Sequence, residues 1–262
     1  MVRSTARPTG WRALGLSRAE LELTDFAAVE RRFRTEQPDA IIHCAAMSRS
    51  PQCQADPVGA RLWNVEVTRH LAGLFAGRRL IFLSTDLVFD GLTGGYDEDA
   101  PVRPLNLYAE TKVEAEAWVR TDPGHLVVRT SLNHGTSPTG DRGFNEEMGR
   151  AWAAGRTLKL FTDEFRSPIP AESTARALWE FLPRDTGGIL HVAGAERLSR
   201  WKIGQCLARS RVGPACPIEP GSLREYQGAP RSPDTSLDCR RAQALLTFPL
   251  PRYSEWLGLG GG

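Results

Sequence analysis

The stretch RLIFLSTD, residues 79–86, decides the fold. Its apolar run, bounded by Arg79 and by Ser-Thr-Asp, is typical of a strand buried on both faces of a sheet. Two similar runs flank it in the chain, AIIHCAA at residues 40–46 and HLVVR at residues 125–129. Segments with helical periodicity separate the three runs. Short apolar strands that alternate with helices predict an α/β fold with a parallel sheet covered on both faces.

The rest of the chain continues this alternation with looser spacing. Residues 1–135 are predicted to form a Rossmann-like doubly wound core, and residues 160–195 return to it. Residues 136–262 are expected to form mainly a smaller α/β substrate-binding lobe. The Pro-, Gly- and Ser-rich stretch 213–236 is predicted to be dominated by loops. Helices are predicted over residues 25–36, 57–75, 105–120, 144–154, 171–182 and 199–209, and further strands over residues 158–161 and 188–192.

Composition excludes several classes of protein. The chain has 262 residues, 41% of them hydrophobic, and a formal charge of only +2. This balance excludes a disordered chain and offers no broad positive surface for nucleic acid. No window of about 18 apolar residues exists, so no membrane span is predicted. The five cysteines are scattered without zinc-ligand spacing, which favours reduced thiols, a cytoplasmic protein and no metal site.

The carboxyl ends of the three strands carry small or polar residues. In an open parallel sheet, ligands bind at this edge. The first strand ends in Cys44-Ala45-Ala46, the second in Ser84-Thr85-Asp86, and the third in Arg129-Thr130-Ser131. Each set alone also fits ordinary turn and cap chemistry. The three sets together favour a ligand site.

The segment Tyr108-Ala109-Glu110-Thr111-Lys112 carries the strongest chemical signal. On a helix, Tyr108 and Lys112 stand at positions i and i+4 and share one face. A lysine ammonium beside a phenol is expected to lower the pKa of Tyr108 and make it a usable acid or base. The alternative is a solvated helix face. Lys112 is one of only three lysines among 33 basic residues, which favours the catalytic interpretation.

These features together resemble the extended short-chain dehydrogenase/reductase superfamily, and within it the dTDP-4-dehydrorhamnose reductase branch. The combination of Ser-Thr-Asp-x-Val-Phe-Asp-Gly with Tyr-x-x-Thr-Lys is specific to that branch. The resemblance runs from about residue 2 to residue 246. Its matching stretches are PDAIIHCAA (38–46), LSTDLVFDG (83–91), PLNLYAETK (104–112), VVRTS (127–131), TDEFRSPIPAE (162–172), GGILHVAG (187–194) and PRSPDTSLDCRRAQALL (230–246).

The resemblance implies a role for each matching residue. Tyr108 would donate a proton to the reduced carbonyl, Thr85 would orient that carbonyl, and Lys112 would hold the nicotinamide ribose of NADPH or NADH. Further residues implied to bind the cofactor are Arg3, Arg7, Ala45, Ala46, Asn64 and Ser84. Residues implied to bind the substrate are Ser48, Asp86, Leu87, Ser131, Leu132 and Arg231.

Two departures from the family pattern bear on function. The first residues, VRSTARPTGW, resemble the second strand of the family, so about 30 residues with the glycine-rich cofactor turn are missing from the sequence. A start site placed too late, a shortened chain and a natural variant with altered cofactor binding each account for this. In the substrate pocket, Leu87 and Leu132 replace a usual Tyr and Trp, which leaves the exact sugar open.

The function implied is NADPH-dependent reduction of a nucleotide-linked 4-keto-6-deoxysugar in deoxysugar biosynthesis. The nicotinamide would supply the hydride and Tyr108 the proton, and a homodimer is an expected assembly. One alternative is a non-catalytic binding or regulatory module, because PRSPDTSLDC (230–239) also resembles the regulatory beta subunit of methionine adenosyltransferase. Another is a related tailoring enzyme with a different substrate.

Overall fold

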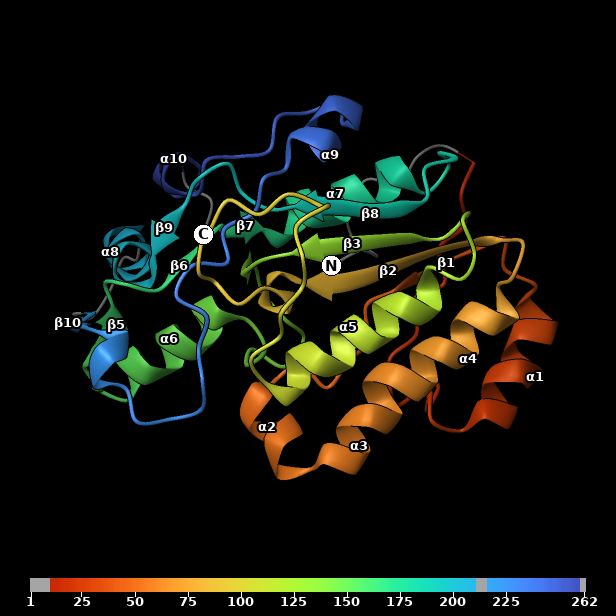
Figure 1. The fold of residues 1–262 in the computed structure, drawn as a ribbon, viewed down its shortest axis with the longest axis horizontal. Helices are drawn as coiled ribbons and strands as arrows, with labels where there is room; N and C mark the ends of the chain where they lie inside the picture. Colours follow the sequence, from red (N-terminus) through yellow and green to blue (C-terminus); the bar gives the residue numbers. More distant parts are fainter. Residues whose placement is uncertain (1–9, 211–215, 260–262) are drawn as a thin grey trace.

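The computed structural model describes residues 10–210 and 216–259. Its centre is a four-stranded parallel sheet in the order β1-β2-β3-β8 (Figure 1). The predicted Rossmann-like α/β fold is confirmed. The strands are β1 (Ala40–His43), β2 (Arg79–Thr85), β3 (Leu126–Thr130) and β8 (Gly188–Val192). β3 is buried along its whole length, as its continuous apolar sequence predicts, whereas β1 at the edge is only partly buried.

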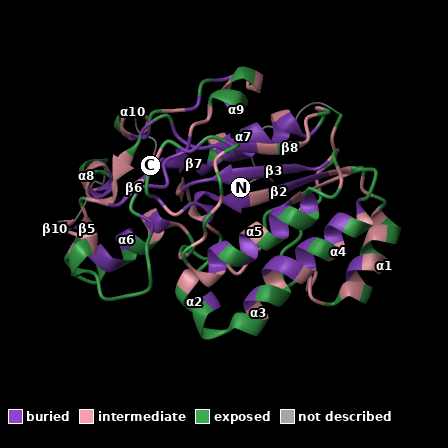
Figure 2. Cartoon of the chain, viewed as in Figure 1, coloured by how far each residue is buried: buried purple, intermediate pink, exposed green. Residues whose placement is uncertain are grey.

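Helices cover both faces of the sheet. On one face, α1 (Phe26–Glu36), α4 (Val67–Leu74) and α5 (Leu107–Val119) pack their apolar sides against the strands. On the other face lie α7 (Ala171–Phe181) and α9 (Arg240–Leu245). Figure 2 shows the same division, with buried residues on the sheet and on the inner sides of the helices. Burial of these apolar sides drives the association of the layers.

The helix predicted over residues 57–75 is interrupted. It consists of α3 (Pro57–Arg61), a π-helical turn at Leu62–Glu66, and α4. A further short helix, α2 (Ser50–Ala55), precedes it and was not predicted. The π-helical turn carries the buried Asn64, and such turns are frequent at functional sites.

A smaller lobe lies beyond the carboxyl ends of the sheet strands (Figure 1). Its core joins α6 (Phe144–Ala153), α8 (Arg200–Ser210) and α10 (Tyr253–Gly258) around β5 (Leu158–Phe161). β10 (Ile218–Gly221) pairs with β5 in parallel, so the stretch predicted to be loop contains a strand. In the sequence, Pro220 argues against a strand here, because proline is tolerated only in edge strands. Two-residue strands complete the lobe: β4 (Asn133–His134), β6 (Phe165–Arg166), β7 (Ile169–Pro170) and β9 (Leu198–Ser199).

The turn after β2 ties the C-terminal segment to the core. Gly91 adopts a φ of +82°, and a Cβ there would lie 2.7 Å from the backbone nitrogen of Pro233. Only glycine allows this approach without strain. The Ser232 hydroxyl donates to the Phe89 carbonyl at 2.9 Å, which fixes the segment from the other side. Residues distant in sequence therefore reach the carboxyl end of β2.

Three buried histidines predict a loss of stability in acid. Burial lowers the pKa of His43 to about 3 and those of His134 and His191 to about 4. The unfolded chain takes up these protons near pH 6.5, whereas the folded chain does not. Stability is therefore fully present above pH 6.5 and falls as the pH decreases toward 4, by up to about 1.4 kcal/mol per histidine and pH unit. Urea unfolding between pH 7 and 4 measures this fall, and a flat curve would contradict it.

No helix within residues 10–210 and 216–259 has the length and apolar character needed to cross a membrane.

Candidate active site

The candidate site lies where β2 ends and α5 begins. Asn106 caps α5, because its side-chain oxygen accepts from the Ala109 nitrogen at 3.1 Å. The helix then places Tyr108, Lys112 and Glu116 one turn apart on its inner face, and all three side chains are buried. The predicted shared face of Tyr108 and Lys112 is therefore present, and Glu116 extends it toward the sheet.

The Lys112 ammonium lies against the end of β2. Its Nζ donates to the Leu83 carbonyl at 2.8 Å and stands 3.8 Å from the centre of the Phe82 ring. Burial lowers the pKa of Lys112 to about 7, and the charge of Glu116 opposes this shift. An ammonium has three donors, and one is used by Leu83. Lys112 therefore keeps donors for a ligand hydroxyl, which fits the ribose of a nicotinamide cofactor.

Tyr108 differs from the sequence expectation in its electrostatics. Burial raises the pKa of its phenol, and hydrogen bonding with the Thr85 hydroxyl only partly opposes that increase. The predicted lowering by Lys112 is wrong for this structure, because the ammonium is turned to the Leu83 carbonyl and the phenol lies in an apolar cluster. Cys53, Ala60 and Leu87 belong to that cluster. Tyr108 is therefore held in its protonated form, the form needed by a proton donor.

The end of β1 provides an open surface beside Lys112. Cys44 and Ala45 are exposed, Ala46 is partly exposed, and Ser48 lies exposed in the following loop. Small side chains at this edge leave room for a flat ligand to approach the backbone. Arg3 and Arg7, also predicted to bind the cofactor, lie outside the described residues.

Asn64 is placed behind this edge. Its side chain is buried, accepts from the Met47 nitrogen at 2.8 Å, and donates to the Met47 carbonyl at 3.1 Å and to the Thr111 hydroxyl at 2.9 Å. These bonds join the loop after β1 to α5. Asn64 thus shapes the predicted cofactor edge from within the protein, and the direct contact with cofactor stays a prediction.

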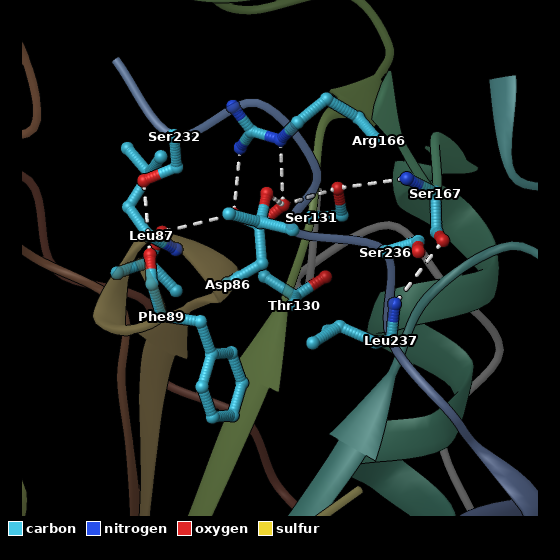
Figure 3. A network of polar contacts seen from close by, with 12 residues as sticks. Asp86, Leu87, Phe89, Thr130, Ser131, Arg166, Ser167, Ser232, Ser236 and Leu237 are labelled. Carbon is cyan, nitrogen blue, oxygen red and sulfur yellow. Dashed lines mark hydrogen bonds and ion pairs between the residues drawn. The ribbon is translucent and has the colours of Figure 1, made fainter. Parts of the chain in front are cut away.

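Asp86 is the centre of a buried polar network (Figure 3). Arg166 from β6 donates to both carboxylate oxygens, through Nε at 2.7 Å and Nη2 at 2.6 Å. The hydroxyls of Ser131 and Thr235 donate to Oδ2 at 2.7 and 3.0 Å. Asp86 and Ser131 were predicted to bind substrate, but the structure engages both with protein groups. The network joins the end of β2, the end of β3, the lobe and the C-terminal segment.

A second ion pair continues this network outward. Glu164 is buried and lies 3.8 Å from Arg166. Arg231 donates to both oxygens of Glu164, at 2.9 and 2.8 Å, while part of its side chain stays exposed. Its guanidinium also lies 5.5 Å from the centre of the Phe161 ring. The predicted substrate residue Arg231 therefore stands at the outer end of a chain of alternating charges that begins at Asp86.

The two leucines of the predicted substrate pocket have different surroundings. Leu87 packs with Tyr108, whereas Leu132 packs against the apolar core of the lobe. Both are partly buried. They present apolar surfaces on the core side and on the lobe side of the site.

Sequence reasoning missed Glu116, Glu164 and Arg166, and it gave Arg129 only as part of the third strand end, with no role of its own. A signal for Glu116 was present, because it repeats the four-residue spacing from Tyr108 to Lys112 on an otherwise buried face. Arg166 lies in a stretch that matched the family without an assigned role. Among residues 10–210 and 216–259, no group of three or more His, Cys, Asp and Glu side chains is arranged to hold a metal ion.

Comparison with known proteins identifies the class. The model of the RmlD substrate binding domain family matches residues 1–259, so the chain belongs to this family. A probable low-salt glycan biosynthesis reductase of Haloferax volcanii is 30% identical over 243 residues, which are 90% of this chain and 81% of that protein. The methionine adenosyltransferase 2 subunit beta of Xenopus laevis is 28% identical over 255 residues, with 91% and 76% covered.

Solved structures agree with this assignment. A hypothetical dTDP-4-dehydrorhamnose reductase from Sulfolobus tokodaii is 29% identical, with a TM-score of 0.79 over 93% of this chain and 86% of that one. The dTDP-4-dehydrorhamnose reductase of Bacillus anthracis, solved with NADP, shares the fold with a TM-score of 0.90 at 22% identity, covering 99% of this chain and 93% of the other. The resemblance to the reductase branch of the superfamily is thereby confirmed.

Proposed function

We propose that this protein is an NADPH-dependent reductase of a nucleotide-linked 4-keto-6-deoxysugar. The observation that carries the proposal is the pairing of a protonated, buried Tyr108 with Thr85 at the end of β2, beside a Lys112 with donors to spare. Membership of the reductase family and the solved relatives with NADP or NAD support it.

The position of each site residue determines its proposed role in the reaction. When bound, the nicotinamide supplies the hydride for the sugar carbonyl. Tyr108 donates its phenolic proton to the carbonyl oxygen, and the Thr85 hydroxyl orients that oxygen. Lys112 holds the ribose through its remaining donors, and the phenolate left on Tyr108 regains a proton from solvent before the next turnover. Ala45 and Ala46 line the cofactor edge, whereas Ser84, also predicted to bind the cofactor, is buried with its hydroxyl donated to Glu116.

The substrate would lie between the core and the lobe. Leu87 and Leu132 offer apolar walls, which suit the methyl group of a 6-deoxysugar better than extra hydroxyl groups. Arg231 is partly exposed at the outer end of the charge chain, where a guanidinium suits a diphosphate. Ser48 would contact the sugar from the loop after β1.

Calorimetric titration with NADPH and NADH tests whether the protein binds the proposed cofactor. We expect saturable binding of NADPH to the folded protein, weakened at least tenfold in Lys112→Ala because the ribose loses a charge-assisted hydrogen bond. Lys202→Ala is the matched control, since Lys202 lies on α8 in the lobe. Oxidation of NADPH that depends on a dTDP-linked 4-keto-6-deoxysugar tests the substrate. A folded sample that binds neither nucleotide would refute the proposal.

A second candidate function is a regulatory module. The similarity to methionine adenosyltransferase 2 subunit beta over 91% of this chain favours it. Such a module needs no turnover. Nucleotide binding without reduction of any nucleotide-linked keto sugar would support it over the reductase.

A further inference from the structure

A row of polar side chains crosses the sheet beneath α5. Ser84 on β2, Arg129 on β3 and His191 on β8 stand at matching positions of the parallel register. All three are buried. Arg129 Nη1 lies 3.5 Å from His191 Nε2, and His191 Nδ1 lies 3.0 Å from the Tyr96 carbonyl oxygen. Buried polar groups of this kind are costly unless each is satisfied, so the row defines one arrangement of the strands.

Glu116 of α5 completes the row from above. Its Oε1 accepts from the Ser84 hydroxyl at 2.6 Å, and its Oε2 accepts from Arg129 Nη2 at 2.7 Å. Arg129 Nε adds a third bond, at 3.0 Å from Oε1. Both ionic side chains are about 3–4% exposed. The carboxylate is therefore fixed on both oxygens and has little freedom to move.

Lys112 and Glu116 form hydrogen bonds to consecutive residues of β2. Lys112 bonds the carbonyl of Leu83, and Glu116 bonds the side chain of Ser84. The next residue is Thr85, which faces Tyr108. A shift of α5 along the strand would break both bonds and displace the Thr85 hydroxyl from the phenol.

We propose that Glu116 is a positioning residue of the reaction centre, which locks the end of β2 to α5 and sets the charge environment of Lys112. This inference rests on the proposed reductase function. Glu116 touches neither of the groups proposed to react, and acts through Ser84, Thr85 and Lys112.

The groups around Lys112 show why its pKa should respond to Glu116 in particular. From β1, His43 is neutral because its pKa is lowered to about 3 by burial and by the nearby Lys112 charge. Cys44, the next residue, is an exposed thiol, and an unperturbed cysteine is mostly protonated at pH 7. Phe82 of β2 presents a ring face. Among these described neighbours, Glu116 is the anion, and its charge is partly balanced by its ion pair with Arg129. Loss of that charge removes the main influence that opposes burial and favours the neutral amine of Lys112.

The scarcity of lysine allows a direct test without turnover. Selective carbon-13 labelling of lysine gives three Cε signals, and Lys112→Arg assigns one of them. In the wild type we expect this signal to titrate near pH 7. In Glu116→Gln it should titrate about one pH unit lower. Glu110→Gln, an exposed position on the same helix, should leave it unchanged.

Kinetics supply the second readout. Glu116→Asp keeps the charge but withdraws it from Ser84, so kcat should fall about tenfold with KM for the sugar little changed. Its lysine signal should shift less than in Glu116→Gln, and it serves as the second variant if the glutamine protein does not fold. Lysine titration in folded Glu116→Gln that matches Glu110→Gln would overturn the proposal, and so would a kcat in Glu116→Asp equal to that of Glu110→Gln. If the proposed reductase function is wrong, the wild-type protein will not bind NADPH. That result is distinct from any change in the Glu116 variants.

Discussion

Tyr108→Phe should lower kcat by a factor of about 10² to 10⁴ while leaving the fold intact. The phenol is the proton donor of the proposed reaction, and phenylalanine keeps the ring but removes the proton. Burial already raises the pKa of Tyr108, so the wild-type donor is fully protonated at neutral pH. Consumption of NADPH in the presence of the keto sugar measures the loss, and thermal unfolding checks the fold.

The control for this variant is Tyr253→Phe. Tyr253 is a buried tyrosine of the lobe whose hydroxyl bonds to His134 Nδ1 at 2.7 Å, away from Thr85. Its loss should reduce stability and leave kcat largely unchanged. Full activity in Tyr108→Phe would remove this residue from the proposed mechanism. Equal losses in the two variants would mean that the effect is structural.

The core of the fold could be predicted because its strands are continuous apolar runs. β2 and β3 are buried by helices on both faces, and each contains an uninterrupted apolar run, at residues 80–83 and 126–128. The lobe could not be predicted to the same extent. Its two-residue strands and β10 exist through pairing with segments far along the chain, and no local pattern encodes such pairs. The interrupted helix likewise carries Asn64, whose side chain bonds to Met47 and Thr111 far from it in the sequence.

The candidate site was predictable to the extent that it is local. The spacing from Tyr108 to Lys112 sets their shared face, and the end of β2 places Thr85 beside them. The orientation of each polar group was not predictable. Lys112 turns to the Leu83 carbonyl rather than toward the phenol, and Asp86 is engaged by Arg166 from a strand 80 residues later. Such partners are selected by tertiary packing and desolvation, which the sequence pattern does not contain.

Breaking the buried Asp86–Arg166 pair should be costly. In Arg166→Met, Asp86 keeps its hydroxyl donors but loses its counter-charge in a site where it is about 1% exposed. A buried charge left without its partner costs about 3–5 kcal/mol, so the free energy of unfolding in urea should fall by that amount. Because the pair joins β6 of the lobe to the turn after β2, we expect the lobe to loosen first.

A double-variant cycle separates the ion pair from the packing around it. Asp86→Leu combined with Arg166→Met removes both charges, so the double variant should be more stable than the sum of the two single losses predicts. Arg240→Met is the matched control, because Arg240 pairs with Asp238 at 2.6 Å on the surface and should change stability by about 0.5 kcal/mol or less. Additive single losses would mean that Asp86 and Arg166 stabilise the protein independently, and that the lobe is not held to the core through their charges.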